Sequence, residues 1–158
     1  MDLVSIIVPY YKKKKFIKRS LRSVLNQSYK KFELIVIYDD TNKKDLIYIK
    51  KIVGGHKKVK IIVNRKNIGV GMSRNKGISI SKGKYICFLD SDDFWSKNKI
   101  KEQIKFMKVN KISISHTSYN IIENNKIISC RSARDFLTLK SLIYSCDIGC
   151  STVMLKKN

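Results

Sequence analysis

Short apolar runs alternate with helical patterns along most of this chain, and this order constrains the fold more than any other feature. Apolar residues recur at helical spacing between the runs, as at Ile17, Leu21 and Val24. Parallel strands need such crossovers, so the order predicts an α/β domain with a mostly parallel, Rossmann-like sheet flanked by helices. We expect one domain over residues 1–158. The four strand-sized runs lie at residues 3–9, 33–38, 59–63 and 84–89.

The last third of the chain predicts a different arrangement. Residues 112–123 are expected to form a strand, Asn124 and Asn125 a turn, and residues 126–130 the hairpin partner. A helix is expected over residues 135–144 and a final strand over residues 151–155. No linker or repeat divides the chain.

Charge and cysteine content limit the possible functions without choosing one. The formal net charge is +22, from 34 Lys and Arg against 12 Asp and Glu. Nucleic acid, an anionic membrane or an anionic substrate would all suit such a chain. The lysines are spread along the whole sequence, however, and no RNA- or DNA-binding motif is present, so a nucleic-acid-binding module is a remote alternative.

Location and redox state are predicted from what the sequence contains. No apolar run approaches the roughly 20 residues of a membrane-spanning helix, and the first residues do not resemble a secretory signal. We therefore expect a cytoplasmic protein. Its four cysteines show no paired C-x-x-C spacing, which disfavours a zinc ribbon and predicts reduced, buried thiols.

Acidic residues gather where two of the predicted strands end. Asp39 and Asp40 follow the second run, and Asp90, Asp92 and Asp93 follow the fourth. Ligands of open parallel sheets bind beyond the carboxyl ends of the strands. Alternating carboxylates on a loop suit Mg²⁺ or Mn²⁺, whose remaining positions go to water and phosphate oxygens. The alternative is an acidic turn that caps the next helix.

Two further segments lie at the same predicted edge. The glycine segment, residues 67–77, would open a helix toward a bound anion, and Arg74 could hold diphosphate oxygens. The alternative is a plain loop with a solvated arginine. Tyr10 and Tyr11 follow the first run, where an aromatic ring could stack on a nucleobase or simply pack at the edge of the core.

Five ordered motifs together resemble the start of a family 2 glycosyltransferase. The resemblance is strong over about residues 3–110 and weaker beyond. It implies a GT-A-type fold, with residues 1–95 as the nucleotide-sugar-binding half and residues 96–158 as a partial acceptor-side half. The motifs are residues 5–11, 23–29, 33–40, 67–77 and 88–95.

The resemblance also implies roles for single residues. Tyr11 is similar to the family's base-stacking aromatic, Asp39 to the aspartate that recognises the base, and Asp40 to a neighbour of the ribose. Arg74 is similar to an arginine that contacts the nucleotide. Asp90 and Asp92 form the D-x-D motif, with Asp92 as the expected metal ligand. Pro9, Asn67 and Ser91 complete the expected nucleotide-sugar site.

The implied activity is metal-dependent, inverting transfer from a nucleotide-diphosphate sugar, most simply a UDP-sugar, to an acceptor hydroxyl. The acceptor is expected to be a glycan or a lipid-linked sugar of a bacterial surface glycan, reached by peripheral contact with the inner face of the plasma membrane. The family's catalytic base belongs to an acidic motif, and no acidic residue after Asp93 in this sequence lies in a segment that matches that motif. The alternative is therefore a catalytically silent fragment that binds the nucleotide sugar.

Overall fold

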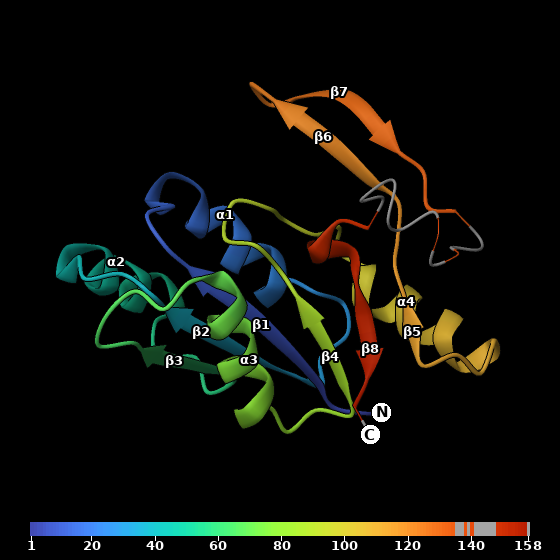
Figure 1. The fold of residues 1–158 in the computed structure, drawn as a ribbon, viewed down its shortest axis with the longest axis horizontal. Helices are drawn as coiled ribbons and strands as arrows, with labels where there is room; N and C mark the ends of the chain where they lie inside the picture. The colour runs from blue at the N-terminus through green and yellow to red at the C-terminus, as the bar shows by residue number, and fades with distance from the viewer. Residues whose placement is uncertain (135–137, 139, 141–147, 158) are drawn as a thin grey trace.

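A six-stranded sheet forms the centre of the molecule within the part of the chain that the structure describes. The structure is a computed structural model that describes residues 1–134, 138, 140 and 148–157. The strand order is β3-β2-β1-β4-β8-β5 (Figure 1). The first four pair in parallel, while β8 runs antiparallel to both β4 and β5. The strands are β1 (Val4–Tyr10), β2 (Phe32–Tyr38), β3 (Val59–Val63), β4 (Tyr85–Phe88), β5 (Ile114–Ser115) and β8 (Met154–Lys156).

Helices cover both faces of this sheet, which confirms the predicted α/β arrangement. The helices are α1 (Lys14–Leu25), α2 (Lys43–Val53), α3 (Val70–Ile80) and α4 (Lys99–Val109). Alternate residues of β1 point to opposite faces. Ile6 and Val8 belong to the apolar cluster that includes α1, α2 and α4, whereas Ile7 packs in the second cluster, to which α3 contributes. Every residue of β1 is buried, as expected of a central strand.

Pro9 fits this central strand because of where the pairing with β4 stops. The last β1–β4 pair is Ile7 with Phe88, so Pro9 lies beyond that ladder. Pro9 is still paired with Ile37 of β2, but its nitrogen faces β4, because the carbonyl of Ile7 accepts from Leu89 after β4 and that of Tyr10 from Asp39 after β2. The missing N–H therefore breaks no hydrogen bond between β1 and β2.

The second half differs from the prediction in two places. Residues 112–123 are not one strand: β5 joins the central sheet, and β6 (Tyr119–Glu123) pairs with β7 (Lys126–Arg131) in a hairpin that projects from it (Figure 1). Asn124 and Asn125 both have positive φ, as a tight hairpin turn requires, so the predicted turn is confirmed. The final strand is also shorter, because residues 150–152 form a 3₁₀ turn, η1, before β8.

Two other predictions have separate outcomes. Cys87 is buried and Cys150 half-buried, but Cys130 is exposed on β7, so the prediction of buried thiols was wrong there. The predicted helix at 135–144 lies outside the described residues, apart from positions 138 and 140.

Gly77 allows α3 to pack directly on β1. A Cβ atom at this position would lie 2.5 Å from Cγ2 of Ile7, a side chain that is fully buried. We expect Gly77→Ala to lower the free energy of unfolding by about 1–3 kcal/mol through overpacking. Gly71→Ala is the matched control on the same helix, because a Cβ atom there meets nothing within 4 Å. The control should be neutral or stabilise by about 0.5 kcal/mol. Urea unfolding measures both, and equal stability of the two variants would contradict the packing argument.

Candidate functional site

Four loops from separate parts of the chain converge at the carboxyl ends of the parallel strands. β1 pairs with β2 on one side and with β4 on the other. Asp39 and Asp40 follow β2, and the acidic loop, residues 90–93, follows β4 after Leu89. The acidic groups predicted to share an edge therefore lie on either side of the end of β1.

Asp39 holds the loop that follows β3. Asp39 is 2% exposed, and its Oδ1 accepts hydrogen bonds from Asn64 Nδ2 at 2.8 Å and from the backbone N–H of Ile68 at 2.9 Å. Oδ2 accepts from the backbone N–H of Gly69, also at 2.9 Å. Asn67 adds a link, since its Nδ2 donates to the backbone carbonyl of Asp39 at 3.0 Å. Asp39 thus organises the start of the glycine segment, a role that the sequence analysis missed.

Asp40 joins the turn after β1 to the loop after β2. Its Oδ2 accepts from the backbone N–H of Lys12 and its Oδ1 from that of Asn42, both at 3.1 Å. Lys12 has a backbone φ of 50°, which is uncommon for a residue other than glycine. The hydrogen bond from its N–H to Asp40 helps to hold this backbone conformation. The turn leaves the neighbouring Tyr11 45% exposed. An aromatic ring is therefore available to a ligand at this edge.

Tyr10 does not belong to the accessible site. It is the last residue of β1, fully buried, and stacks on Tyr38 with ring centroids 5.1 Å apart. Its hydroxyl donates to Asp45 Oδ2 at 2.8 Å. Burial raises the pKa of Tyr38 to about 12 and also raises that of Tyr10. Of the two tyrosines considered for stacking on a nucleobase, only Tyr11 is placed to do so.

Cations from the chain itself pair with two of the three carboxylates of the acidic loop. Arg74 on α3 lies 2.6 Å from Asp90 Oδ1, and Lys13 Nζ lies 2.8 Å from Asp92 Oδ2. The hydrogen bond to Asp92 raises the pKa of Lys13. These two ion pairs offset part of the repulsion between the carboxylates. Ser91, between them, is buried.

Asp93, the third carboxylate of the acidic loop, is held by a residue far away in the sequence. Ser151 Oγ donates to Asp93 Oδ2 at 2.5 Å and accepts from the backbone N–H of Asp90 at 3.0 Å. Trp95 Nε1 donates to the backbone carbonyl of Ser151 at 2.7 Å. Burial raises the pKa of Asp93, and the charges of Asp90 and Asp92 add to the increase. No local pattern around Ser151 indicates this role.

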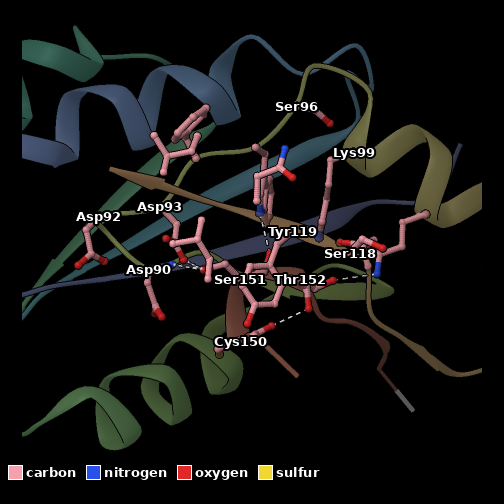
Figure 2. Close-up of a pocket in the computed structure, with 18 of the residues that line it drawn as sticks. Asp90, Asp92, Asp93, Ser96, Lys99, Ser118, Tyr119, Cys150, Ser151 and Thr152 are labelled. Carbon is pink, nitrogen blue, oxygen red and sulfur yellow. Dashed lines mark hydrogen bonds between the residues drawn. The ribbon is translucent and has the colours of Figure 1, made fainter. Parts of the chain in front are cut away.

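A cleft of about 910 Å³ opens beside the acidic loop. Figure 2 shows Asp90, Asp92 and Asp93 on one side of it and Lys99, Ser118 and Tyr119 on the other. None of the residues at the ends of β1 and β2 lines this cleft. The acidic loop therefore lies between that edge and the cleft. The lining residues come from Arg19 of α1, the acidic loop with residues 94–96, the start of α4, the hairpin strand β6 with residues 117–118, and η1 with Gly149.

A metal ion at the acidic loop would have two protein carboxylates available. Among residues 1–134, 138, 140 and 148–157, no three His, Cys, Asp or Glu side chains form a group able to hold a metal. Mg²⁺ and Mn²⁺ sites that include substrate phosphates need only one or two carboxylates, since phosphate and water oxygens complete the shell. The side chains of Asp90 and Asp92 are both about one-third exposed, which fits a cation that arrives with a ligand.

Comparison with protein families gives a match to glycosyl transferase family 2 over residues 5–147. The chain is 38% identical over 155 residues to WfgD of Escherichia coli, a UDP-Glc:alpha-D-GlcNAc-diphosphoundecaprenol beta-1,3-glucosyltransferase. This alignment covers 98% of the chain but 60% of the relative. The chain thus spans about three-fifths of that relative's length. Among the described residues, no helix has the length and apolar character to cross a membrane.

Two solved structures resemble the fold. TarS of S. aureus in complex with UDP-GlcNAc matches with a TM-score of 0.79 at 22% identity, covering 99% of this chain and 45% of that one. The mannosyltransferase PcManGT from Pyrobaculum calidifontis, in complex with GDP-Man and Mn²⁺, matches with a TM-score of 0.65 at 17% identity, covering 72% and 34%. These likenesses confirm the expected fold.

Proposed function

Because the chain belongs to glycosyl transferase family 2, we propose that it transfers a sugar from a UDP-sugar to a hydroxyl of a lipid-linked glycan acceptor. The observation that carries the proposal is the convergence of Asp39, Asp40, Arg74 and the acidic loop at one sheet edge. The choice of UDP is supported by the WfgD relative and by the UDP-GlcNAc complex of TarS. The lipid-linked acceptor is supported by the same relative's diphosphoundecaprenol substrate.

The donor's nucleoside is proposed to bind between the ends of β1 and β2. Tyr11 would stack on the uracil. Asp39 Oδ2 accepts one hydrogen bond in the protein, so it keeps capacity for a base N–H. Asp40 would lie near the ribose, while Pro9, Asn67 and Ser91 would shape this pocket.

The diphosphate is proposed to lie over the start of α3 and the acidic loop. Arg74 and Lys13 are the cationic side chains paired with Asp90 and Asp92, and both can donate hydrogen bonds to phosphate oxygens. Asp92, with Asp90, would hold Mn²⁺ or Mg²⁺. When bound, that ion neutralises the charge that develops on the leaving nucleoside diphosphate. Transfer with inversion at the sugar carbon is part of the proposal and follows from the family resemblance.

We propose a cytoplasmic reaction at the inner face of the membrane. The net charge of +22 would draw the protein to anionic lipids, where a lipid-linked acceptor resides. Nucleic acid is not proposed as a partner, because the carboxylates of the acidic loop would repel its phosphate backbone.

A thermal-shift panel tests the nucleotide preference. The chain is heated with UDP, GDP, CDP and ADP, each with and without Mn²⁺, and with a single-stranded oligonucleotide as a control. We expect the largest rise in Tm with UDP and Mn²⁺ together, since ligand at 100 times its Kd adds about 2.7 kcal/mol of stability. Equal shifts with all four nucleotides, or a larger shift with the oligonucleotide, would contradict the proposed donor.

Turnover separates an enzyme from a silent binding fragment. The chain is incubated with UDP-glucose, Mn²⁺ and a GlcNAc-diphospho-lipid, and UDP release is followed. Release that depends on the acceptor supports the transferase. UDP binding without any release would favour the silent fragment.

A further inference from the structure

Lys99 is a buried cation at the cleft that the proposed donor site does not use. It is the first residue of α4, is 8% exposed, and lines the cleft beside the acidic loop. Figure 2 shows its side chain running from the start of α4 toward Tyr119 and Ser118. Its ammonium lies 4.1 Å from the centroid of the Trp95 ring.

This ammonium has no hydrogen-bond partner among the described residues. Burial lowers the pKa of Lys99, which reflects the cost of keeping a charge away from water. A buried cation needs an opposite charge or several acceptors to offset that cost, and an aromatic face supplies only part of it. A second buried polar atom on α4, Gln103 Oε1, also has no hydrogen-bond partner among the described residues. Gln103 lies one helical turn after Lys99, so the two side chains are on the same face of the helix.

The rest of Gln103 is firmly held. Its Nε2 donates to the backbone carbonyl of Ser115 at 3.2 Å, to Ser115 Oγ at 3.0 Å and to the carbonyl of Thr152 at 3.0 Å. The amide is therefore fixed by β5 and η1. One donor, Lys99 Nζ, and one acceptor, Gln103 Oε1, are thus left for a molecule in the cleft.

We propose that Lys99 binds an anionic oxygen of the acceptor, as supplied by the phosphate next to its first sugar. This inference rests on the proposed function. The donor's own phosphates are assigned to the other side of the acidic loop, so an anion in the cleft belongs to the second substrate. Two cations, Arg19 and Lys99, line the cleft among the described residues. Arg19 stacks on Phe94, with its guanidinium carbon 4.2 Å from the ring centroid, and lies close enough to Asp93 to counter part of the rise in the pKa of that carboxyl group, so it belongs to the acidic loop, where Asp90, Asp92 and Asp93 repel an anion. Lys99 is the cation of the cleft away from that loop. Gln103 Oε1 would accept from a sugar hydroxyl or amide.

A matched pair of probes tests the proposal without turnover. GlcNAc-1-phosphate and the uncharged methyl α-GlcNAc are titrated by calorimetry into the chain saturated with UDP and Mn²⁺; glucuronic acid supplies a carboxylate instead of a phosphate. We expect the phosphate probe to bind at least about tenfold more tightly than the neutral one, as charge-assisted hydrogen bonding predicts. In Lys99→Met this preference should fall to about twofold or less. Lys101→Met, an exposed lysine on the same helix, should retain it.

UDP binding is measured on each variant so that the two proposals can fail separately. If the wild-type chain does not bind UDP, the proposed function fails. If UDP binds normally but Lys99→Met keeps the tenfold preference, or the wild type has none, the acceptor role of Lys99 is wrong. Tighter binding of glucuronic acid than of GlcNAc-1-phosphate would contradict the phosphate assignment, because it would show that the cleft selects a carboxylate. Should Lys99→Met not fold, the Lys99 ε-methylene NMR signal of the wild type must shift with GlcNAc-1-phosphate and not with the neutral sugar; an unchanged signal contradicts the proposal.

Discussion

Asp92→Asn is expected to weaken Mn²⁺-dependent UDP binding at least about 100-fold. Loss of an outer-shell partner already costs a metal site about 10–100-fold, and Asp92 is proposed as a direct ligand. Asn retains the shape of the side chain but has no negative charge. In the absence of metal, UDP affinity should stay the same or rise slightly, because Lys13, which lies 2.8 Å from Asp92, is freed to bind phosphate. Calorimetric titration with Mn²⁺ and with EDTA measures both quantities.

Asp2→Asn provides the matched control for this variant. Asp2 is also paired with lysines, with Lys108 Nζ at 2.7 Å, but it precedes β1 and so lies at the opposite edge of the sheet. It should leave UDP affinity unchanged with and without Mn²⁺. If Asp92→Asn and Asp2→Asn behave alike, Asp92 is not the metal ligand.

Asp39→Ala is expected to lower the free energy of unfolding by about 3–4 kcal/mol and to loosen the loop after β3. The substitution leaves the donors of Asn64, Ile68 and Gly69 without their acceptor, and each buried unsatisfied donor costs about 1–3 kcal/mol. Part of that cost is recovered if the loop opens to water. Urea unfolding gives the stability, and hydrogen exchange should show faster exchange at the amides of Ile68 and Gly69.

Glu123→Ala serves as the control for stability, because Glu123 is exposed at the end of β6. A surface change of this kind should stay within about 0.5 kcal/mol. Stability of Asp39→Ala equal to that of Glu123→Ala, with unchanged exchange at Ile68 and Gly69, would show that Asp39 does not organise the loop.

Much of the first half of the fold could be predicted, because its strands and helices are encoded by local periodicity. A fully buried strand such as β1 gives an apolar run that is visible in isolation, and the position of Asp39 and Asp90 directly after such runs predicts a shared edge. The nucleotide-sugar ligand was predicted from the resemblance to the family and not from the periodicity. The hairpin turn was predicted from residue type, since asparagine tolerates the positive φ that Asn124 and Asn125 both adopt.

The remainder depends on contacts between residues far apart in the sequence. Tyr10 and Tyr11 look equivalent as a pair, yet β1 ends between them, and only the stacking of Tyr10 on Tyr38 decides which ring is buried. Ser151 acts on Asp93 across 58 positions. The two-residue strand β5 is too short to show a period, so its separation from β6 could not be predicted.

The position of bound Mn²⁺ tests the central claim most directly. Amide signals of the isotopically labelled chain are recorded with UDP as substoichiometric Mn²⁺ is added, since the paramagnetic ion broadens nearby resonances. The account predicts broadening at Asp90 to Asp93 and at Lys12 and Lys13, only when UDP is present, while Asn124 and Asn125 at the hairpin turn remain sharp. Broadening centred elsewhere, or the same broadening without UDP, would contradict a diphosphate and its metal bound between the ends of β1 and β4.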